Sequence, residues 1–140
     1  MRAASLTLLC WLSLNATALA ACDPPAPVRF PAGATATDLQ GGVARGERDC
    51  FSLGARQGQT LSITQPGIAQ PNIAIQVYRP PWHIGHGDHA VTVTGTALKG
   101  AEEGADATQW QGRLPVSGSY LLVVGTIRGG DAYRLHVEVH

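Results

Sequence analysis

From Val28 onward, apolar and polar residues alternate in short runs that are separated by Gly, Pro, Asn or Asp. A period of two is typical of strands that bury one face, and the separating residues are typical of turns. No segment has a sustained helical period, and 99–108 is at most one helical turn within a Gly-containing loop. The pattern predicts strands over Thr35 to Val43, Asp49 to Ala55, Thr60 to Gln65, Asn72 to Tyr78, Val91 to Thr94, Trp110 to Leu114, Tyr120 to Gly125 and Tyr133 to Val139.

Two of these segments indicate which faces are buried. From Tyr133 to Val139 the odd-numbered residues are Tyr, Leu and Val, whereas the even-numbered ones are charged or His. Tyr120 to Val124 is apolar at both parities, so we expect the second sheet to cover one of its faces and a loop the other. About eight short strands, with turns about every ten residues, predict an all-β fold, an antiparallel β-sandwich of jelly-roll type.

The first 21 residues differ from the rest. They begin with Arg2, continue through an apolar stretch over 6–14 and end on small residues, which is typical of an export signal. The apolar stretch is too short to cross a bilayer as a helix. The sequence therefore predicts a signal peptide over 1–21, a Pro-rich extended lead-in over 22–27 and a single domain over 28–140, exported to the periplasm.

The two cysteines after the signal leave two alternatives open. The sequence around Cys22 resembles a bacterial lipobox, which predicts acylation of Cys22 and leaves Cys50 as a lone thiol. An ordinary cut after Ala20 instead leaves Cys22 and Cys50 free to form a disulfide in an oxidising compartment. The exported protein is accordingly either soluble or lipid-anchored.

Charge excludes some classes of function. Lys and Arg together number 10, and Asp and Glu also number 10, without a block of like charge. This balance gives no electrostatic case for binding nucleic acid or an anionic membrane surface.

There is no G-x-S-x-G motif, and Cys50 has no identifiable His partner. We therefore predict a protein that is not an enzyme and needs no cofactor.

One segment is rich in potential metal ligands. Three imidazoles and a carboxylate fall within seven residues and could converge on a transition metal, although their spacing matches no structural zinc pattern. A flexible Gly-rich loop explains the same residues equally simply. The metal-binding hypothesis uses His83, His86, Asp88 and His89. Likewise, the acidic residues in 102–106 either offer oxygens to calcium or form a solvated loop, and they lack calcium-loop spacing.

Three aromatic residues suggest a carbohydrate-binding alternative. Trp82, Trp110 and Tyr78 could stack on the sugar rings of peptidoglycan, whereas single aromatics on strands more often belong to the core.

The strongest local pattern is Gly112-Arg113-Leu114-Pro115-Val116-Ser117-Gly118-Ser119-Tyr120. Pro presets its own φ, Gly118 accepts an unusual φ, and Tyr120 staples the corner at the start of the next strand. An architectural role is sufficient to explain this pattern.

A resemblance to a known family extends over 28–140. The sequence resembles the bacterial pre-peptidase C-terminal domain and its relative, the periplasmic inhibitor of g-type lysozyme. The matching residues are Gly46-Glu47-Arg48-Asp49-x-Phe51-x-Leu53-x-Ala55, Gly58-Gln59-Thr60-Leu61, Asn72, Tyr78-Arg79-Pro80, the Leu-Pro-x-Ser-Gly-x-Tyr corner and Tyr133-x-Leu135.

The resemblance implies a compact β-sandwich that binds a partner at the cell envelope, with a lysozyme as the candidate. It also implies that Ser117, Gly118, Tyr120 and Arg128 contact that partner. A hydroxyl and a guanidinium on a rigid loop suit an acidic catalytic cleft, because charge-assisted hydrogen bonds to carboxylates are strong. The leading hypothesis is thus a non-catalytic exported binding protein, with peptidoglycan binding and periplasmic metal binding as alternatives.

Overall fold

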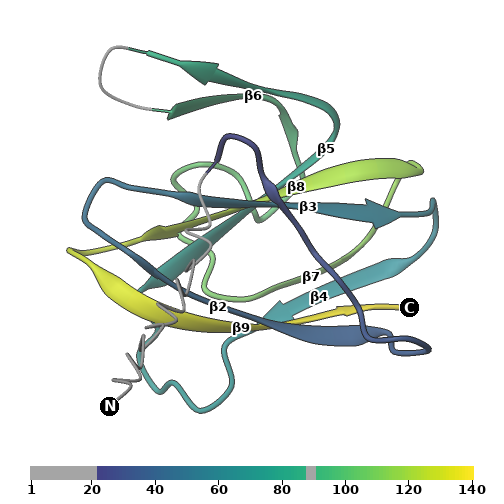
Figure 1. Ribbon diagram of the computed structural model, residues 1–140, viewed down its shortest axis with the longest axis horizontal. Coiled ribbons are helices and arrows are strands. Elements are labelled where there is room, and N and C mark those ends of the chain that lie inside the picture. The colour runs from purple at the N-terminus through teal and green to yellow at the C-terminus, as the bar shows by residue number, and fades with distance from the viewer. Residues whose placement is uncertain (1–21, 88–90) are drawn as a thin grey trace, which may run out of the picture.

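The computed structural model describes residues 22–87 and 91–140, which form two packed β-sheets (Figure 1). No helix occurs in this part of the chain, so none there could cross a membrane. The strands are β1 (Ala26–Pro27), β2 (Ala36–Val43), β3 (Asp49–Ala55), β4 (Thr60–Thr64), β5 (Ile73–His86), β6 (Val91–Ala97), β7 (Trp110–Arg113), β8 (Gly118–Thr126) and β9 (Asp131–Val139).

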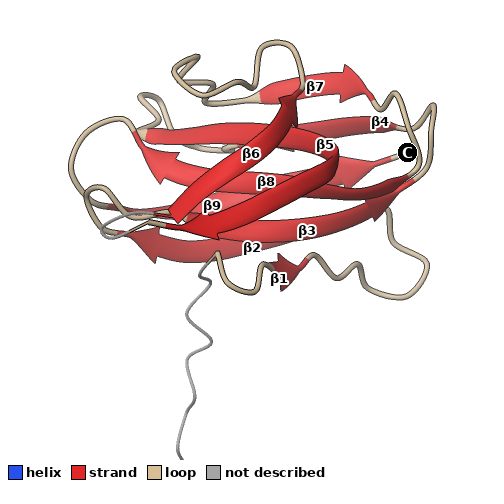
Figure 2. Cartoon of the chain, turned by 90° about the horizontal axis from the view of Figure 1, so that it is seen from above, coloured by secondary structure: helices blue, strands red, loops and turns tan. Residues whose placement is uncertain are grey.

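The strand order confirms the predicted jelly roll. One sheet has the order β1-β3-β8-β5-β6 and the other the order β2-β9-β4-β7. The pairings are antiparallel except for the two-residue β1, which runs parallel to β3. Apart from β1, the chain passes to the opposite sheet after every strand but β5, which is the path of a double-sheet jelly roll. Figure 2 shows the two layers from above.

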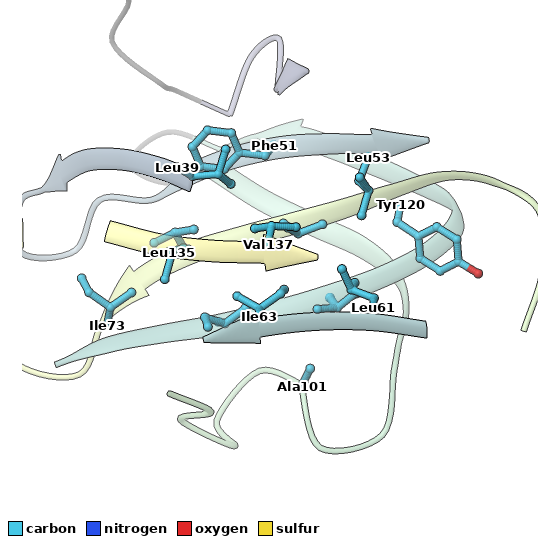
Figure 3. Packing of buried hydrophobic residues seen from close by; sticks show 14 of the residues in the cluster. Leu39, Phe51, Leu53, Leu61, Ile63, Ile73, Ala101, Tyr120, Leu135 and Val137 are labelled. Atoms are coloured by element: carbon cyan, nitrogen blue, oxygen red, sulfur yellow. The ribbon is translucent and has the colours of Figure 1, made fainter. Parts of the chain in front are cut away.

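The predicted alternation places one face of each sheet in a shared core. In the β2–β9 pair Leu39 lies opposite Leu135, and in the β4–β9 pair Ile63 lies opposite Val137. Leu135, Val137 and Ile63 are fully buried. The core also includes Phe51, Leu53, Leu61, Ile73, Ala101 and Tyr120, which project between the two layers (Figure 3).

The outer face of the five-stranded sheet carries a second, smaller apolar cluster. Leu121 and Val123 of β8 point away from the main core and pack with Tyr78 and the Cys22–Cys50 pair. The β5–β6 hairpin folds back over this face and covers the cluster with Trp82, Ile84, Val91 and Val93 (Figures 1 and 2). This confirms that β8 is covered on both faces, with a hairpin and the lead-in in place of the expected loop.

The lead-in segment is held by a disulfide between Cys22 and Cys50. Of the two alternatives for Cys22, the structure therefore has the disulfide. A sulfur atom in a disulfide cannot also carry the thioether of a lipid anchor, so acylation of Cys22 is incompatible with this form. The predicted signal peptide, 1–21, lies outside the described residues.

The largest difference from the predicted strands is the length of β5. The sequence predicted a strand from Asn72 to Tyr78, which ends before Pro80 and Pro81. The strand continues to His86, and its register against β6 shifts between Arg79 and Trp82. Both prolines lie within this irregularity, where a strand tolerates residues that cannot donate to the ladder.

Candidate functional site

The Ser-Gly-x-Tyr corner joins β7 to β8 and is fixed from within by Tyr120. The Tyr120 hydroxyl donates a hydrogen bond to the Val116 carbonyl (2.6 Å) and accepts one from the Val116 N–H (3.2 Å). The Tyr120 side chain is fully buried. Tyr120 therefore braces the corner, as the architectural interpretation expects, and presents no side-chain surface to a partner.

Ser117 lies at the tip of this corner and is exposed. Its Oγ accepts a hydrogen bond from the Gln57 N–H at 2.8 Å. Two backbone bonds join the same loops: Gly58 donates to the Leu114 carbonyl (2.9 Å), and Leu114 donates to the Gln59 carbonyl (2.8 Å). Among the described residues the Ser117 hydroxyl donates to no acceptor, so its proton is free to bond with an incoming group.

The first residue of β8, Gly118, requires the absence of a side chain. Its φ is +146°, and a Cβ at this position would lie 2.9 Å from Cγ of Pro80. The Trp82 indole N–H donates to the Ser119 carbonyl at 2.8 Å. The corner thus rests directly on the bend of β5, and both loops are held in place before any partner arrives.

Two arginines share this end of the sandwich with Ser117. Arg56 opens the β3–β4 loop, Arg113 ends β7, and both are exposed. We call the loop segments 56–59 and 113–119 the Ser117 end. It contains two guanidiniums and no acidic residue. Sequence reasoning missed both arginines, because the two loops come together through the pairing of Thr60 with Arg113 and the hydrogen bonds beside it, which a local motif does not reveal.

Arg128, which the family resemblance implies as a partner contact together with Ser117, lies at the opposite end of β8 from Ser117. The nine residues of β8, Gly118–Thr126, separate the two positions. At about 3.3 Å per residue this amounts to roughly 30 Å. The structure therefore does not bring Ser117 and Arg128 together, because β8 holds its two ends apart.

The loop that carries Arg128 is clamped by Asn72. The Asn72 side chain accepts a hydrogen bond from the Arg128 N–H (2.9 Å) and donates one to the Arg128 carbonyl (2.7 Å). Arg45 and Arg128 line a shallow recess of about 510 Å³ at this end. Asn72 was part of the family pattern, but no sequence motif indicates this clamp.

Charges around the Arg128 loop are mixed. A neighbouring cleft of about 280 Å³ is lined by Arg48 and by three carboxylates, those of Glu47, Glu103 and Asp106. Arg48 forms an ion pair with Glu103 at 3.0 Å. The Ser117 end is thus the more uniformly basic of the two ends.

The described histidines of the metal hypothesis do not converge. His83 and His86 lie on β5, whereas the sequence predicted a flexible loop. Three residues apart on a strand, they point to opposite faces. His86 Nε2 instead contacts an Asp23 carboxylate oxygen at 2.8 Å. The described residues contain no group of three or more metal-binding side chains, and Asp88 and His89 lie outside them.

The acidic loop is likewise engaged with the protein itself. Glu103 pairs with Arg48, and the Glu102 carboxylate accepts a hydrogen bond from the Gly100 N–H at 2.8 Å. These contacts favour the interpretation of 102–106 as a surface loop.

The three aromatic candidates for sugar stacking form no exposed platform. Tyr78 is buried and donates to the Gln76 side chain (2.8 Å). Trp82 and Trp110 are half-buried, and each uses its indole N–H on a backbone carbonyl, that of Ser119 and that of Lys99. Their positions agree with the structural interpretation of these residues.

Comparisons with known proteins identify similar solved structures, among them three periplasmic lysozyme inhibitors. A periplasmic lysozyme inhibitor of g-type lysozyme from Aeromonas hydrophila, PliG, matches with a TM-score of 0.58 and 26% sequence identity, over 82% of this chain and 95% of that protein. PliG from Salmonella Typhimurium matches with a TM-score of 0.56 and 18% identity, over 81% and 96% of the two chains. A PliG mutant from Escherichia coli has a TM-score of 0.57 and 16% identity, over 82% and 96%.

The last two similarities establish the fold alone. Scans against protein-family models and against curated protein sequences found no match.

Proposed function

We propose that this chain is a non-catalytic periplasmic inhibitor of a g-type lysozyme. The observation that carries the proposal is the similarity to the Aeromonas hydrophila inhibitor, which extends over 95% of that protein at 26% identity. Because the match includes nearly the whole inhibitor, no separate module of that protein is left unmatched. The proposal also explains why the two predicted alternatives, metal binding and sugar stacking, have no assembled site among the described side chains.

We propose further that the Ser117 end is the surface that enters the lysozyme cleft. Glycosidases generally cut their substrates with a pair of carboxyl groups, so their clefts attract cations. Arg56 and Arg113 supply two guanidiniums without a competing acid in the same segments. Ser117 adds a hydroxyl proton that no described acceptor uses. Hydrogen bonds from such groups to a carboxylate are charge-assisted and therefore stronger than neutral ones.

Preorganisation supports the choice of this end. The two loops are joined by three hydrogen bonds, those between Gln57 and Ser117, Gly58 and Leu114, and Leu114 and Gln59. The buried Tyr120 hydroxyl holds the corner from below. A loop that is already ordered loses little conformational entropy on binding, which favours affinity.

The disulfide is consistent with periplasmic residence. Cys22 and Cys50 are bonded to each other, and disulfides persist in oxidising compartments such as the bacterial periplasm. Since the Cys22 sulfur is already used, we propose the soluble form in place of the lipid-anchored one.

The test is inhibition of cell-wall lysis by g-type lysozyme, titrated with the purified mature protein. The wild type should slow lysis in a saturable manner. Arg56→Ala and Arg113→Ala should each raise the inhibition constant about tenfold or more, which corresponds to about 1.4 kcal/mol. Added salt should weaken inhibition by the wild type more than inhibition by the combined Arg56→Ala/Arg113→Ala variant, because screening acts on the guanidiniums.

Arg45→Ala and Arg128→Ala are the matched controls. Each removes an exposed arginine from the opposite end of the sandwich. They should leave the inhibition constant within about twofold of wild type, since surface arginines outside an interface contribute little. Undiminished lysis at a large molar excess of the wild type would refute the inhibitor function. Loss of inhibition in Arg128→Ala but not in Arg56→Ala or Arg113→Ala would move the site to the other end.

A further inference from the structure

Strand β6 is an edge strand whose outer side is free. It ends the five-stranded sheet, and within residues 22–87 and 91–140 its backbone pairs only with β5. Its sequence is Val-Thr-Val-Thr-Gly-Thr-Ala, with five β-branched residues, no charge and no proline. A strand of this kind presents unpaired N–H and C=O groups and favours pairing with another strand.

The other edges of the two sheets carry features that oppose such pairing. Strand β1 has two residues, of which one is Pro27, and β7 has four residues and ends on Arg113. Strand β2 carries the charged residue Asp38. Short length, charge and proline are devices that keep sheet edges from associating. Only β6, among the edges of the described sheets, has the length and composition of a pairing strand.

The sequence of β6 is also complementary to itself. In an antiparallel pair of two copies with a twofold axis at Thr94, Thr94 lies opposite Thr94, and Thr92 lies opposite Thr96. Threonine pairs across neighbouring strands are favourable. These three threonines are exposed and share the outer face of the hairpin.

The inner face of the two paired β6 strands also accommodates the second copy. Val91 and Val93 contribute to the second apolar cluster. About the same axis, Val93 of one copy faces Gly95 of the other, where no side chain competes for space. A Cβ at Gly95 would lie 3.2 Å from the Trp82 Cβ, so Gly95 adjoins Trp82, which packs against the second apolar cluster. The second clusters of the two copies would thereby become continuous.

We propose that two copies of this chain associate through antiparallel pairing of their β6 strands about a twofold axis at Thr94. The pairing joins two five-stranded sheets and creates no like-charge contact within the paired strands, because β6 carries no charge. Seven residues on each side form a small interface, so the dimer is of the weak, reversible class. The inference is independent of the proposed function, because it does not involve the Ser117 end.

Sedimentation velocity of the mature protein from about 10 µM to about 1 mM tests the proposal, since interfaces of this size dissociate in that range. The wild type should shift from monomer to dimer as the concentration rises. Thr94→Lys and Thr94→Asp should each stay monomeric, because like charges then face each other at the axis. An equimolar mixture of the two variants should dimerise again, because opposite charges then meet.

Gln111→Lys, on the exposed face of edge strand β7, is the control and should dimerise like the wild type. Circular dichroism checks that each variant is folded. A wild type that stays monomeric throughout the range, or a dimer that persists in Thr94→Lys, would overturn the proposal. Failure of the mixed variants to dimerise would also overturn it.

Discussion

The Tyr133 hydroxyl donates a 2.6 Å hydrogen bond to the Asp49 carboxylate across the interior of the sandwich. Asp49 is the buried charged residue of the described chain, with 8% of its surface exposed. Burial raises the pKa of Asp49, and the bond from Tyr133 opposes that rise. Burial also raises the pKa of Tyr133 well above its ordinary value, with a further contribution from the bond to Asp49. The pair thus links the start of β3 to β9.

Tyr133→Phe should destabilise the fold by about 1 to 3 kcal/mol at pH 7, because it leaves the buried Asp49 carboxylate without its donor. Urea unfolding measures the loss. A raised pKa in the folded state means that stability increases as the pH falls through that pKa, since the folded state then binds the proton more tightly. The loss of unfolding free energy in Tyr133→Phe should therefore become smaller in acid, where the Asp49 carboxylate is protonated. The same substitution made in an Asp49→Asn background should show no such pH dependence, and a persistent one would contradict this assignment.

The Tyr133 side chain also leaves no room for a side chain at Gly41. A Cβ at Gly41 would lie 2.6 Å from the Tyr133 hydroxyl oxygen, whereas at the neighbouring Gly42 the nearest atom would be 3.9 Å away. Gly41→Ala should therefore cost about 1 to 3 kcal/mol of the free energy of unfolding through overpacking. Gly42→Ala should change it by less than about 0.5 kcal/mol. Equal effects of the two substitutions in thermal or urea unfolding would show that Tyr133 moves aside.

The Cys22–Cys50 bond closes a loop of 28 residues and attaches the lead-in to β3. The chain-entropy relation gives about 3 to 4 kcal/mol for a loop of this length. Dithiothreitol should lower the urea midpoint of the wild type accordingly. It should leave unchanged the midpoint of the Cys22→Ser/Cys50→Ser variant, which already lacks the bond. A reductant effect of the same size on both proteins would show that the loss does not arise from this disulfide.

The positions and buried faces of most strands could be predicted because each strand follows a period of two. Asp49 to Ala55 was predicted with its observed bounds, and the double apolar parity of Tyr120 to Val124 indicated a strand covered on both sides. The predicted end of β5 at Tyr78 was wrong, because the strand continues past Pro80 and Pro81 through an irregularity between Arg79 and Trp82, where proline is tolerated.

The arrangement of the candidate site could not be predicted in the same way. Ser117 was found from its local motif, but its neighbours Arg56 and Arg113 come from other loops and are joined to it by strand pairing. The family resemblance implied both Ser117 and Arg128 as partner contacts, and the structure places them at opposite ends of β8. The alternation within one strand shows which of its faces is buried. The residues that make up the candidate site depend instead on which strands become neighbours in the sheet.

The exposed face of the four-stranded sheet carries a cluster of charge around Asp38. Its carboxylate accepts a hydrogen bond from Arg134 (2.8 Å) and contacts His136 Nδ1 (2.8 Å). Arg134, and to a lesser extent His136, lower the pKa of Asp38 below 3.8. A lowered folded-state pKa means that the stabilisation is complete above pH 3.8 and is lost as the pH falls through the folded-state pKa.

Asp38→Asn should therefore lower the free energy of unfolding at neutral pH and have little effect in strong acid, where the wild-type carboxyl is protonated as well. Urea unfolding across the acid range, at low ionic strength, makes the difference measurable, because salt screens exposed pairs. Asp131→Asn is the control, since Asp131 is an exposed carboxylate of β9 with no ion pair among the described side chains. If the stability profiles of Asp38→Asn and Asp131→Asn coincide at every pH, the contacts of Asp38 with Arg134 and His136 do not stabilise the fold.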